Sequence, residues 1–209
     1  MGGRVWQQVG LGLLCAMLMA SAANAGRKHQ RTALPPELTL AEQQSLLAGF
    51  LVSRPMRFEQ QGGHYVGGLS YLIVDCSAQQ VRSVLDRPSS FRHFLPNTKN
   101  VRVSTSHQLE LVQGNELVQA TYTVKLHRRE DDNELRFWLD PGEPHDIRDV
   151  WGYFRVSPFG SSQSLVTVAV ALDIGPGIAR LLFEDIIQEL ILSTPRYLDD
   201  YLAELAASS

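Results

Sequence analysis

Five polar side chains in this sequence are candidates for acid–base chemistry, which needs a titratable group within hydrogen-bond reach of a substrate carbonyl. They lie after a proline- and glycine-rich loop, at the start of the next expected strand, and beside a phenylalanine: His145, Asp146, Arg148, Asp149 and His93. Residues in such places more often cap turns or face solvent than react. We therefore expect none of them to be catalytic, although an inward-facing acid–base pair would make the protein an enzyme.

The sequence predicts no metal centre and no cofactor. Its six histidines form no H-x-x-x-H pattern and no histidine–cysteine pattern, so no local spacing suits a shared metal ion. The P-loop, G-x-G-x-x-G and G-x-S-x-G motifs are absent, which leaves nucleotide binding and serine-hydrolase chemistry without support. Cys76 is the only cysteine beyond residue 25, and we expect it to be an inert core residue.

The first 25 residues have the composition of a secretory signal. Arg4 supplies the positive start, residues 9–20 form a short apolar core, and Ala23-Asn24-Ala25 is a small-residue cleavage site. An apolar run of this length is too short to span a bilayer comfortably. We expect cleavage after Ala25 and export to the periplasm, with an uncleaved anchor as the alternative.

The charge of the chain argues against nucleic acid as a partner. The full sequence has a net charge of −3, and beyond residue 25 it has 18 basic and 22 acidic residues, a net charge of −4. Such a chain has no general attraction for nucleic acid or anionic lipid. A transient contact with a membrane stays open, and the sequence has no marker of oligomeric state.

Residues 26–62 read as a linker and an amphipathic helix outside the main sheet. Thr39 and Glu42 match a capping box, in which each side chain binds the other residue's free backbone N–H. Apolar residues follow at helical spacing, and Arg54-Pro55 would end the helix. We expect this helix to dock on the outside of the sheet or to cover a cavity.

Two short helices are expected between two strands in residues 70–103. Ser77 can cap a helix over residues 78–85, and Pro88 blocks its continuation. A second short helix would then carry Phe91 and Phe94. This arrangement indicates a sheet wrapped around a cavity.

The remainder of the chain predicts an antiparallel sheet followed by one long helix. Period-two alternation dominates residues 101–174, as a sheet with two different faces requires. Residues 178–206 then place apolar side chains on one helical face, suited to lying across the sheet. We expect Pro195 to bend this helix, because proline lacks the N–H that would bond to Ile191.

This order of elements resembles the START-like superfamily, also called the SRPBCC, helix-grip or polyketide cyclase/dehydrase and lipid-transport group. The similarity is carried by residues 74–86, by Phe91 and Phe94-Leu95-Pro96, and by Trp151-Gly152-Tyr153, which looks like the family's late-strand G-x-W region in altered order. It implies an α+β helix-grip domain over residues 63–207, with a curved antiparallel sheet around a long C-terminal helix.

The resemblance also implies an apolar cavity between the sheet and that helix, holding a hydrophobic small molecule such as a lipid or isoprenoid. Its expected walls are aromatic and aliphatic: Tyr122, Phe137, Trp151, Tyr153, Phe183, Ile187, Leu190 and Tyr201. A strand register shifted by one residue would exchange the strand members of this set for the outer face. The alternatives are a polyketide cyclase- or dehydratase-like enzyme and a protein-interaction module whose cavity is filled by its own core.

Overall fold

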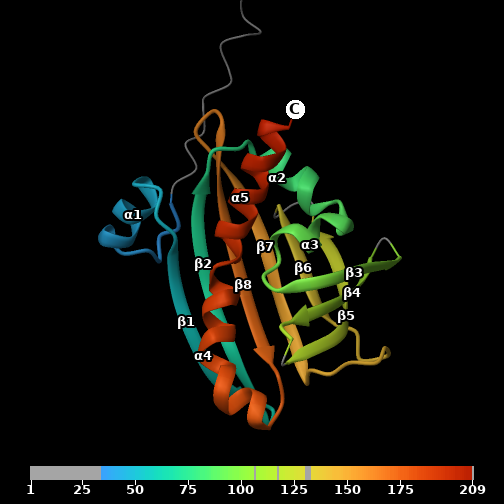
Figure 1. The fold of residues 1–209 in the computed structure, drawn as a ribbon. Coiled ribbons are helices and arrows are strands. Elements are labelled where there is room, and N and C mark those ends of the chain that lie inside the picture. Colours follow the sequence, from blue (N-terminus) through green and yellow to red (C-terminus); the bar gives the residue numbers. More distant parts are fainter. Residues whose placement is uncertain (1–33, 106, 117, 130–132, 209) are drawn as a thin grey trace, which may run out of the picture. The chain divides into compact units, whose positions relative to one another are not determined.

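Eight antiparallel strands form one curved sheet in the computed structural model, in the order β1-β2-β8-β7-β6-β5-β4-β3 (Figure 1). The structure describes residues 34–208 except 106, 117 and 130–132, so the predicted signal at residues 1–25 lies outside the described residues. The strands are β1 (Val52–Gln60), β2 (Gly63–Val74), β3 (Thr98–Thr105), β4 (Gln108–Gly114), β5 (Gln119–Arg129), β6 (Glu134–Leu139), β7 (Asp149–Phe159) and β8 (Gln163–Asp173).

Strand β1 corrects the expectation that residues 26–62 lie outside the sheet. It pairs with β2 along its whole length, from Val52 opposite Tyr71 to Gln60 opposite Gly63. The prediction took Pro55 as a helix terminator, but a proline is tolerated in a strand at the edge of a sheet, where no further partner needs its N–H. The chain therefore uses this segment to extend the sheet by one edge strand.

Strand β2 contains two glycines that no other residue could replace without strain. Gly67 and Gly68 have φ values of +148° and +141°, a region that side chains with a Cβ rarely adopt. A Cβ on Gly67 would lie 2.0 Å from the carbonyl oxygen of Val170, and one on Gly68 would lie 2.1 Å from that of Arg54. The backbone of β2 thus approaches both of its neighbouring strands, β1 and β8, closely at these glycines.

The predicted capping box at Thr39 and the predicted helix cap at Ser77 are both confirmed. Helix α1 (Leu40–Leu47) begins at Thr39, whose backbone N–H donates to Glu42 Oε2 over 2.7 Å while its hydroxyl accepts from the Glu42 N–H. Helix α2 (Ala78–Leu85) begins at Ser77, which forms the same reciprocal pair with Gln80. Local side-chain chemistry therefore sets where both helices start.

The expected single C-terminal helix is two helices. Helix α4 (Ile178–Leu192) ends at Ser193, and α5 (Thr194–Ala207) begins there. Pro195 occupies the first turn of α5, where a missing N–H costs no helical hydrogen bond. The predicted bend at Pro195 is therefore a break between two helices, with the proline in the first turn of the second.

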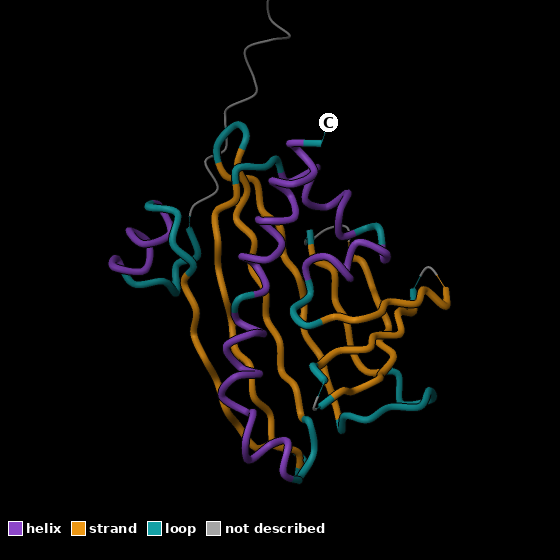
Figure 2. The backbone as a smooth tube through the Cα atoms, viewed as in Figure 1, coloured by secondary structure: helices purple, strands orange, loops and turns teal. Residues whose placement is uncertain are grey.

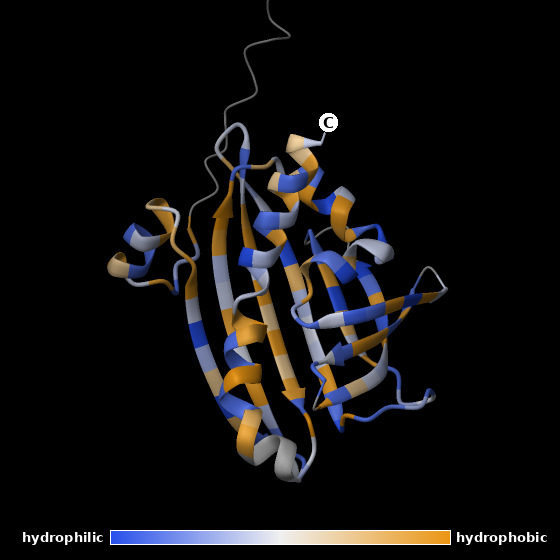
Figure 3. Ribbon diagram, viewed as in Figure 1, coloured by the Kyte–Doolittle hydropathy of each residue, from blue (hydrophilic) through white to orange (hydrophobic). Residues whose placement is uncertain are grey.

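Helices α4 and α5 lie across the concave side of the sheet, while α1 lies beside β1 (Figure 2). From residue 182 onward, hydrophobic residues of α4 alternate with hydrophilic ones (Figure 3). A 3-10 turn (Pro88–Ser90) and the short helix α3 (Phe91–Phe94) follow α2 and close one end of the core. Phe94 and Leu198 are both fully buried there, so α3 and α5 seal the part of the sheet that α4 leaves open.

Candidate functional site: a two-chambered cavity

The concave face of the sheet and the helices across it enclose a cavity with two adjoining chambers. The inner chamber has a volume of about 80 Å³, and the outer chamber has a volume of about 270 Å³. Five residues line both chambers, and we call them the waist: Pro96, Gln113, Tyr122, Leu172 and Ile191. Since the chambers share these walls, one elongated molecule could occupy both.

The inner chamber is almost entirely apolar. Strands β4 to β8 supply most of its wall, and the remainder comes from α3, the loop that follows α3, the end of α4 and the start of α5. Besides the waist it is lined by Phe91, Leu95, Leu109, Leu111, Val124, Leu126, Phe137, Val150, Phe154, Val170 and Thr194. Such a wall offers dispersion contacts and favours hydrocarbon over any polar group.

The outer chamber lies between α4 and the ends of the strands. Helix α4 contributes Phe183, Ile186, Ile187 and Leu190. Opposite them lie β-strand termini and loops that carry the polar residues of the rim, including Asn97, Asn115, Gln119 and Asp146. This chamber therefore has an apolar wall on α4 and polar residues among the strand ends and loops opposite.

Five of the eight residues predicted from the sequence line the cavity. Tyr122 and Phe137 lie in the inner wall, and Phe183, Ile187 and Leu190 lie in the outer wall. Their role as ligand contacts stays a prediction. Tyr201 lines neither chamber; its ring stacks on His93, with centroids 4.9 Å apart, and packs against the core.

Trp151 and Tyr153 were wrongly assigned to the cavity and lie on the outer face of the sheet. Their neighbours Val150 and Phe154 point inward instead, and Trp151 is 42% exposed. Large residues occur on both faces of β7, and the inward position between them is Gly152, so the alternation alone favoured the wrong register. Trp151 packs beside Phe58 on the outer face, with ring centroids 6.3 Å apart.

A hydrogen-bonded polar pair lies at the waist. The Tyr122 hydroxyl bonds to Gln113 Oε1, and the Gln113 amide nitrogen donates to the Pro96 carbonyl oxygen over 3.2 Å and to Thr98 Oγ1 over 3.0 Å. Burial raises the pKa of Tyr122, so its phenol stays neutral. This pair places a fixed polar group in the wall that the two chambers share.

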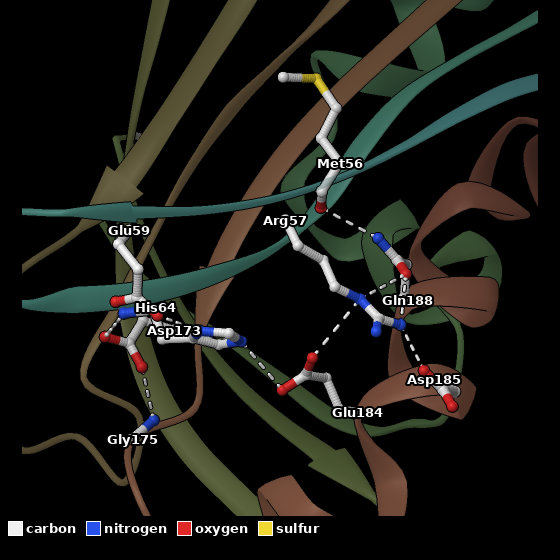
Figure 4. Close-up of polar contacts among 9 residues, drawn as sticks. All are labelled: Met56, Arg57, Glu59, His64, Asp173, Gly175, Glu184, Asp185 and Gln188. Atoms are coloured by element: carbon white, nitrogen blue, oxygen red, sulfur yellow. Dashed lines mark hydrogen bonds and ion pairs between the residues drawn. The ribbon is translucent and has the colours of Figure 1, made fainter.

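Sequence reasoning missed the polar contacts that hold α4 to the sheet (Figure 4). Gln188 is 6% exposed, and its amide nitrogen donates to the carbonyl oxygens of Met56, over 3.0 Å, and Gly67, over 2.9 Å. Its side-chain oxygen accepts from Arg57 Nη2 over 3.0 Å. The helical projection placed Gln188 on a solvated face, and no local signal links it to residues more than 120 positions away.

Two acidic residues of α4 extend these contacts. Glu184 lies 3.5 Å from Arg57 Nε and 3.2 Å from His64 Nε2, and Asp185 pairs with Arg57. His64 also contacts Glu59, and its backbone N–H donates to Asp173 over 3.1 Å. We call Arg57, His64, Glu184, Asp185 and Gln188 the α4 anchor. It fixes one flank of the helix while the opposite flank lines the outer chamber.

This architecture matches solved structures. A START superfamily protein from Mycobacterium smegmatis superposes with a TM-score of 0.56 at 14% identity, covering 74% of this chain and 98% of that one. The chain has the START-like helix-grip fold. The STAR-related lipid transfer protein of Xanthomonas axonopodis gives a TM-score of 0.52 at 15% identity, over 72% of this chain and 98% of that one.

The Zhui aromatase/cyclase from a Streptomyces species gives a TM-score of 0.54 at 10% identity, covering 75% of this chain and 94% of that one. No protein-family model and no curated protein matches the sequence. The START-like fold is thus recognised through its structure, and at these identities it does not by itself define an activity.

In the folded structure, the five candidate acid–base residues lie in different places and have different partners. His145 Nδ1 contacts the Ile147 carbonyl oxygen at 2.7 Å, Arg148 lies 3.8 Å from Asp173, and Asp149 accepts from the Tyr65 hydroxyl over 2.7 Å. Of the five, Asp146 alone lines a chamber, where its carboxylate accepts from the Thr121 N–H over 2.8 Å. The geometry therefore brings no two of them together at the cavity.

Among the described residues, no group of three or more His, Cys, Asp or Glu side chains is placed to hold a metal ion. None of the helices in the described part of the chain is long and apolar enough to cross a membrane.

Proposed function

We propose that this protein is an exported START-like module that binds and carries a hydrophobic small molecule, of lipid or isoprenoid type, between α4 and the sheet. The observation that carries the proposal is the cavity itself, with an apolar inner chamber joined to an outer chamber of 270 Å³. Well-packed protein interiors leave few voids larger than a water molecule. A cavity of this size with a few polar groups is suited to an organic ligand.

Two further observations support this function. Structural neighbours with the same fold include a protein described as a lipid transfer protein, although that description belongs to the neighbour. The signal-like pattern of residues 1–25 supports export, and the periplasm is the compartment that we propose.

An enzyme of the cyclase or dehydratase type has less support from the site. Acid–base catalysis needs groups that face the same substrate atom. Asp146 is the only charged residue among the described residues that line the two chambers. It has no titratable partner among them other than Tyr122, whose pKa is raised by burial.

A charged residue placed in the wall tests the proposal. Ile187→Arg puts a guanidinium into the outer chamber, whereas Leu182→Arg changes a residue of the same helix that is 64% exposed. Binding of the neutral dye N-phenyl-1-naphthylamine, followed by fluorescence, should weaken at least about tenfold in Ile187→Arg, because the charge opposes an apolar ligand.

The same dye should bind Leu182→Arg as it binds the wild-type protein. Circular dichroism and the Tm of both variants would establish that each is folded. Equal dye binding by the two folded variants would show that the dye does not enter this cavity and would refute the proposed site.

A further inference from the structure

Pro96 fixes the direction of the hydrogen bonds at the waist. A carbonyl oxygen only accepts hydrogen bonds, so the amide nitrogen of Gln113 must face Pro96, 3.2 Å away. The amide oxygen of Gln113 therefore faces Tyr122. Since an amide oxygen cannot donate, the hydroxyl of Tyr122 is the donor in the bond between them.

This direction decides what the waist can offer to a ligand. Both amide hydrogens of Gln113 are used, on Pro96 and Thr98, and the single O–H of Tyr122 is used on Gln113. The Tyr122 and Gln113 oxygens each keep a lone pair, to which no described residue donates. The waist therefore presents acceptors to the cavity and has no spare donor.

The charge of the cavity wall also disfavours an anionic ligand. No positively charged residue is among the described residues that line either chamber, and the carboxylate of Asp146 lies at the outer one. A ligand carboxylate or phosphate would be buried there without a cation, which is costly. A ketone or ester would place its lone pairs against those of Tyr122 and Gln113 and leave its own acceptor unsatisfied.

We propose that the ligand carries a hydroxyl group, which donates a hydrogen bond to the Tyr122–Gln113 pair while its hydrocarbon fills the inner chamber. The ligand class is then a neutral hydrophobic alcohol. This inference rests on the proposed function, since it names the ligand of the same cavity.

Three probes that share a twelve-carbon chain test the proposed hydroxyl group of the ligand. They are dodecanol, methyl dodecanoate and dodecanoate. Each competes with N-phenyl-1-naphthylamine for the wild-type protein at neutral pH. A hydrogen bond is worth about 0.5–1.5 kcal/mol, so dodecanol should bind about threefold to tenfold more tightly than the ester, and the dodecanoate anion should bind most weakly. An ester or an anion that binds as tightly as dodecanol would overturn the proposal.

A variant separates this role from a merely structural one. Gln113→Leu removes the acceptor of the Tyr122 hydroxyl, which is then free to donate to a ligand carbonyl. The preference for dodecanol should fall, and methyl dodecanoate should gain affinity over its value in the wild-type protein, by about threefold or more. A variant that loses affinity for all probes in parallel would contradict the proposed direction of the bond.

The two proposals fail in different ways. Dye and dodecanol that bind normally, with an equally tight ester, refute the hydroxyl assignment and leave the hydrophobic cavity intact. If neither the dye nor any of the three probes binds to the folded wild-type protein, the proposed function is refuted together with this inference. The comparison in the wild-type protein does not depend on whether Gln113→Leu folds.

Discussion

Glu42 joins the start of α1 to the edge strand. Arg54 donates to both of its carboxylate oxygens, from Nε over 2.9 Å and from Nη2 over 2.7 Å, and the Thr39 N–H donates as well. These hydrogen bonds, that from Arg54 above all, lower the pKa of Glu42 from 4.5 to about 2. A single carboxylate thus caps a helix and fixes it to the sheet.

The depressed pKa of Glu42 predicts a specific acid sensitivity. Its stabilising effect is present above the unfolded value of 4.5 and is lost as the pH falls toward the folded value of about 2. Glu42→Gln should therefore be less stable than the wild-type protein at neutral pH and should show a shallower fall in stability between these two values. Because the pair is partly exposed, we expect a small effect.

Urea unfolding at a series of pH values measures this difference. Glu143→Gln, in the exposed loop before β7, is the matched control and should keep the wild-type pH dependence. Parallel pH profiles for Glu42→Gln and the wild-type protein would contradict the assigned role of Glu42.

Residue-scale prediction from the sequence succeeded where the partners are close along the chain. Thr39 and Glu42 are three positions apart, so their capping box could be read directly. Arg54 is 12 positions from Glu42, and Gln188 is 121 positions from Gly67. Such pairs form only when the elements pack together, and no spacing in the local sequence indicates them.

At the scale of elements, α4 is held by polar contacts on one flank and faces a cavity on the other. In the sheet, α4 packs mainly against β2, and also against β1 and β8. The α4 anchor supplies the polar part of these contacts, and Gln188 alone binds two backbone carbonyl oxygens and Arg57. The position of this wall of the outer chamber therefore depends on the anchor.

Gln188→Leu should loosen α4. The substitution removes the hydrogen bond from the Gln188 side chain to the buried carbonyl oxygen of Gly67, and we expect a loss of about 1–3 kcal/mol in unfolding free energy. Backbone amides over residues 178–192 should exchange hydrogen for deuterium faster, as measured by mass spectrometry. Gln79→Leu, at an exposed position of α2, should change stability by less than about 0.5 kcal/mol. Unchanged protection of α4 in Gln188→Leu would show that the anchor does not hold the helix.

The elements themselves could be predicted where capping or proline marks their ends. The predicted helix over residues 78–85 agrees with α2, because Ser77 and Pro88 bracket it. Strand β1 was missed because Pro55 was taken as a helix terminator. The register of β7 was wrong because Trp151 and Tyr153 provide an aromatic pattern on the face opposite to Phe154. Which face of a curved sheet is buried depends on where the covering helices lie, and these helices, α4 and α5, come after all the strands in the chain.

At the scale of the whole molecule, the fold and the place of the cavity could be predicted, but whether the cavity is open or filled by the core could not. The order of strands and helices indicated a START-like helix-grip fold, which the structural neighbours share. The sequence pattern of alternating apolar residues is the same whether those side chains enclose a ligand or pack against one another. Only the packed side chains show an inner chamber of 80 Å³ and an outer chamber of 270 Å³ that share Tyr122 and Gln113 in their walls.

Native mass spectrometry of the protein purified from its own source organism tests the central claim most directly. We predict a complex with one neutral hydrophobic molecule per chain, which organic extraction recovers. Protein carrying Ile187→Arg, produced in the same way, should have the mass of the polypeptide alone. Wild-type protein that is folded, has only its polypeptide mass and yields an empty extract would contradict the claim that the cavity holds a ligand.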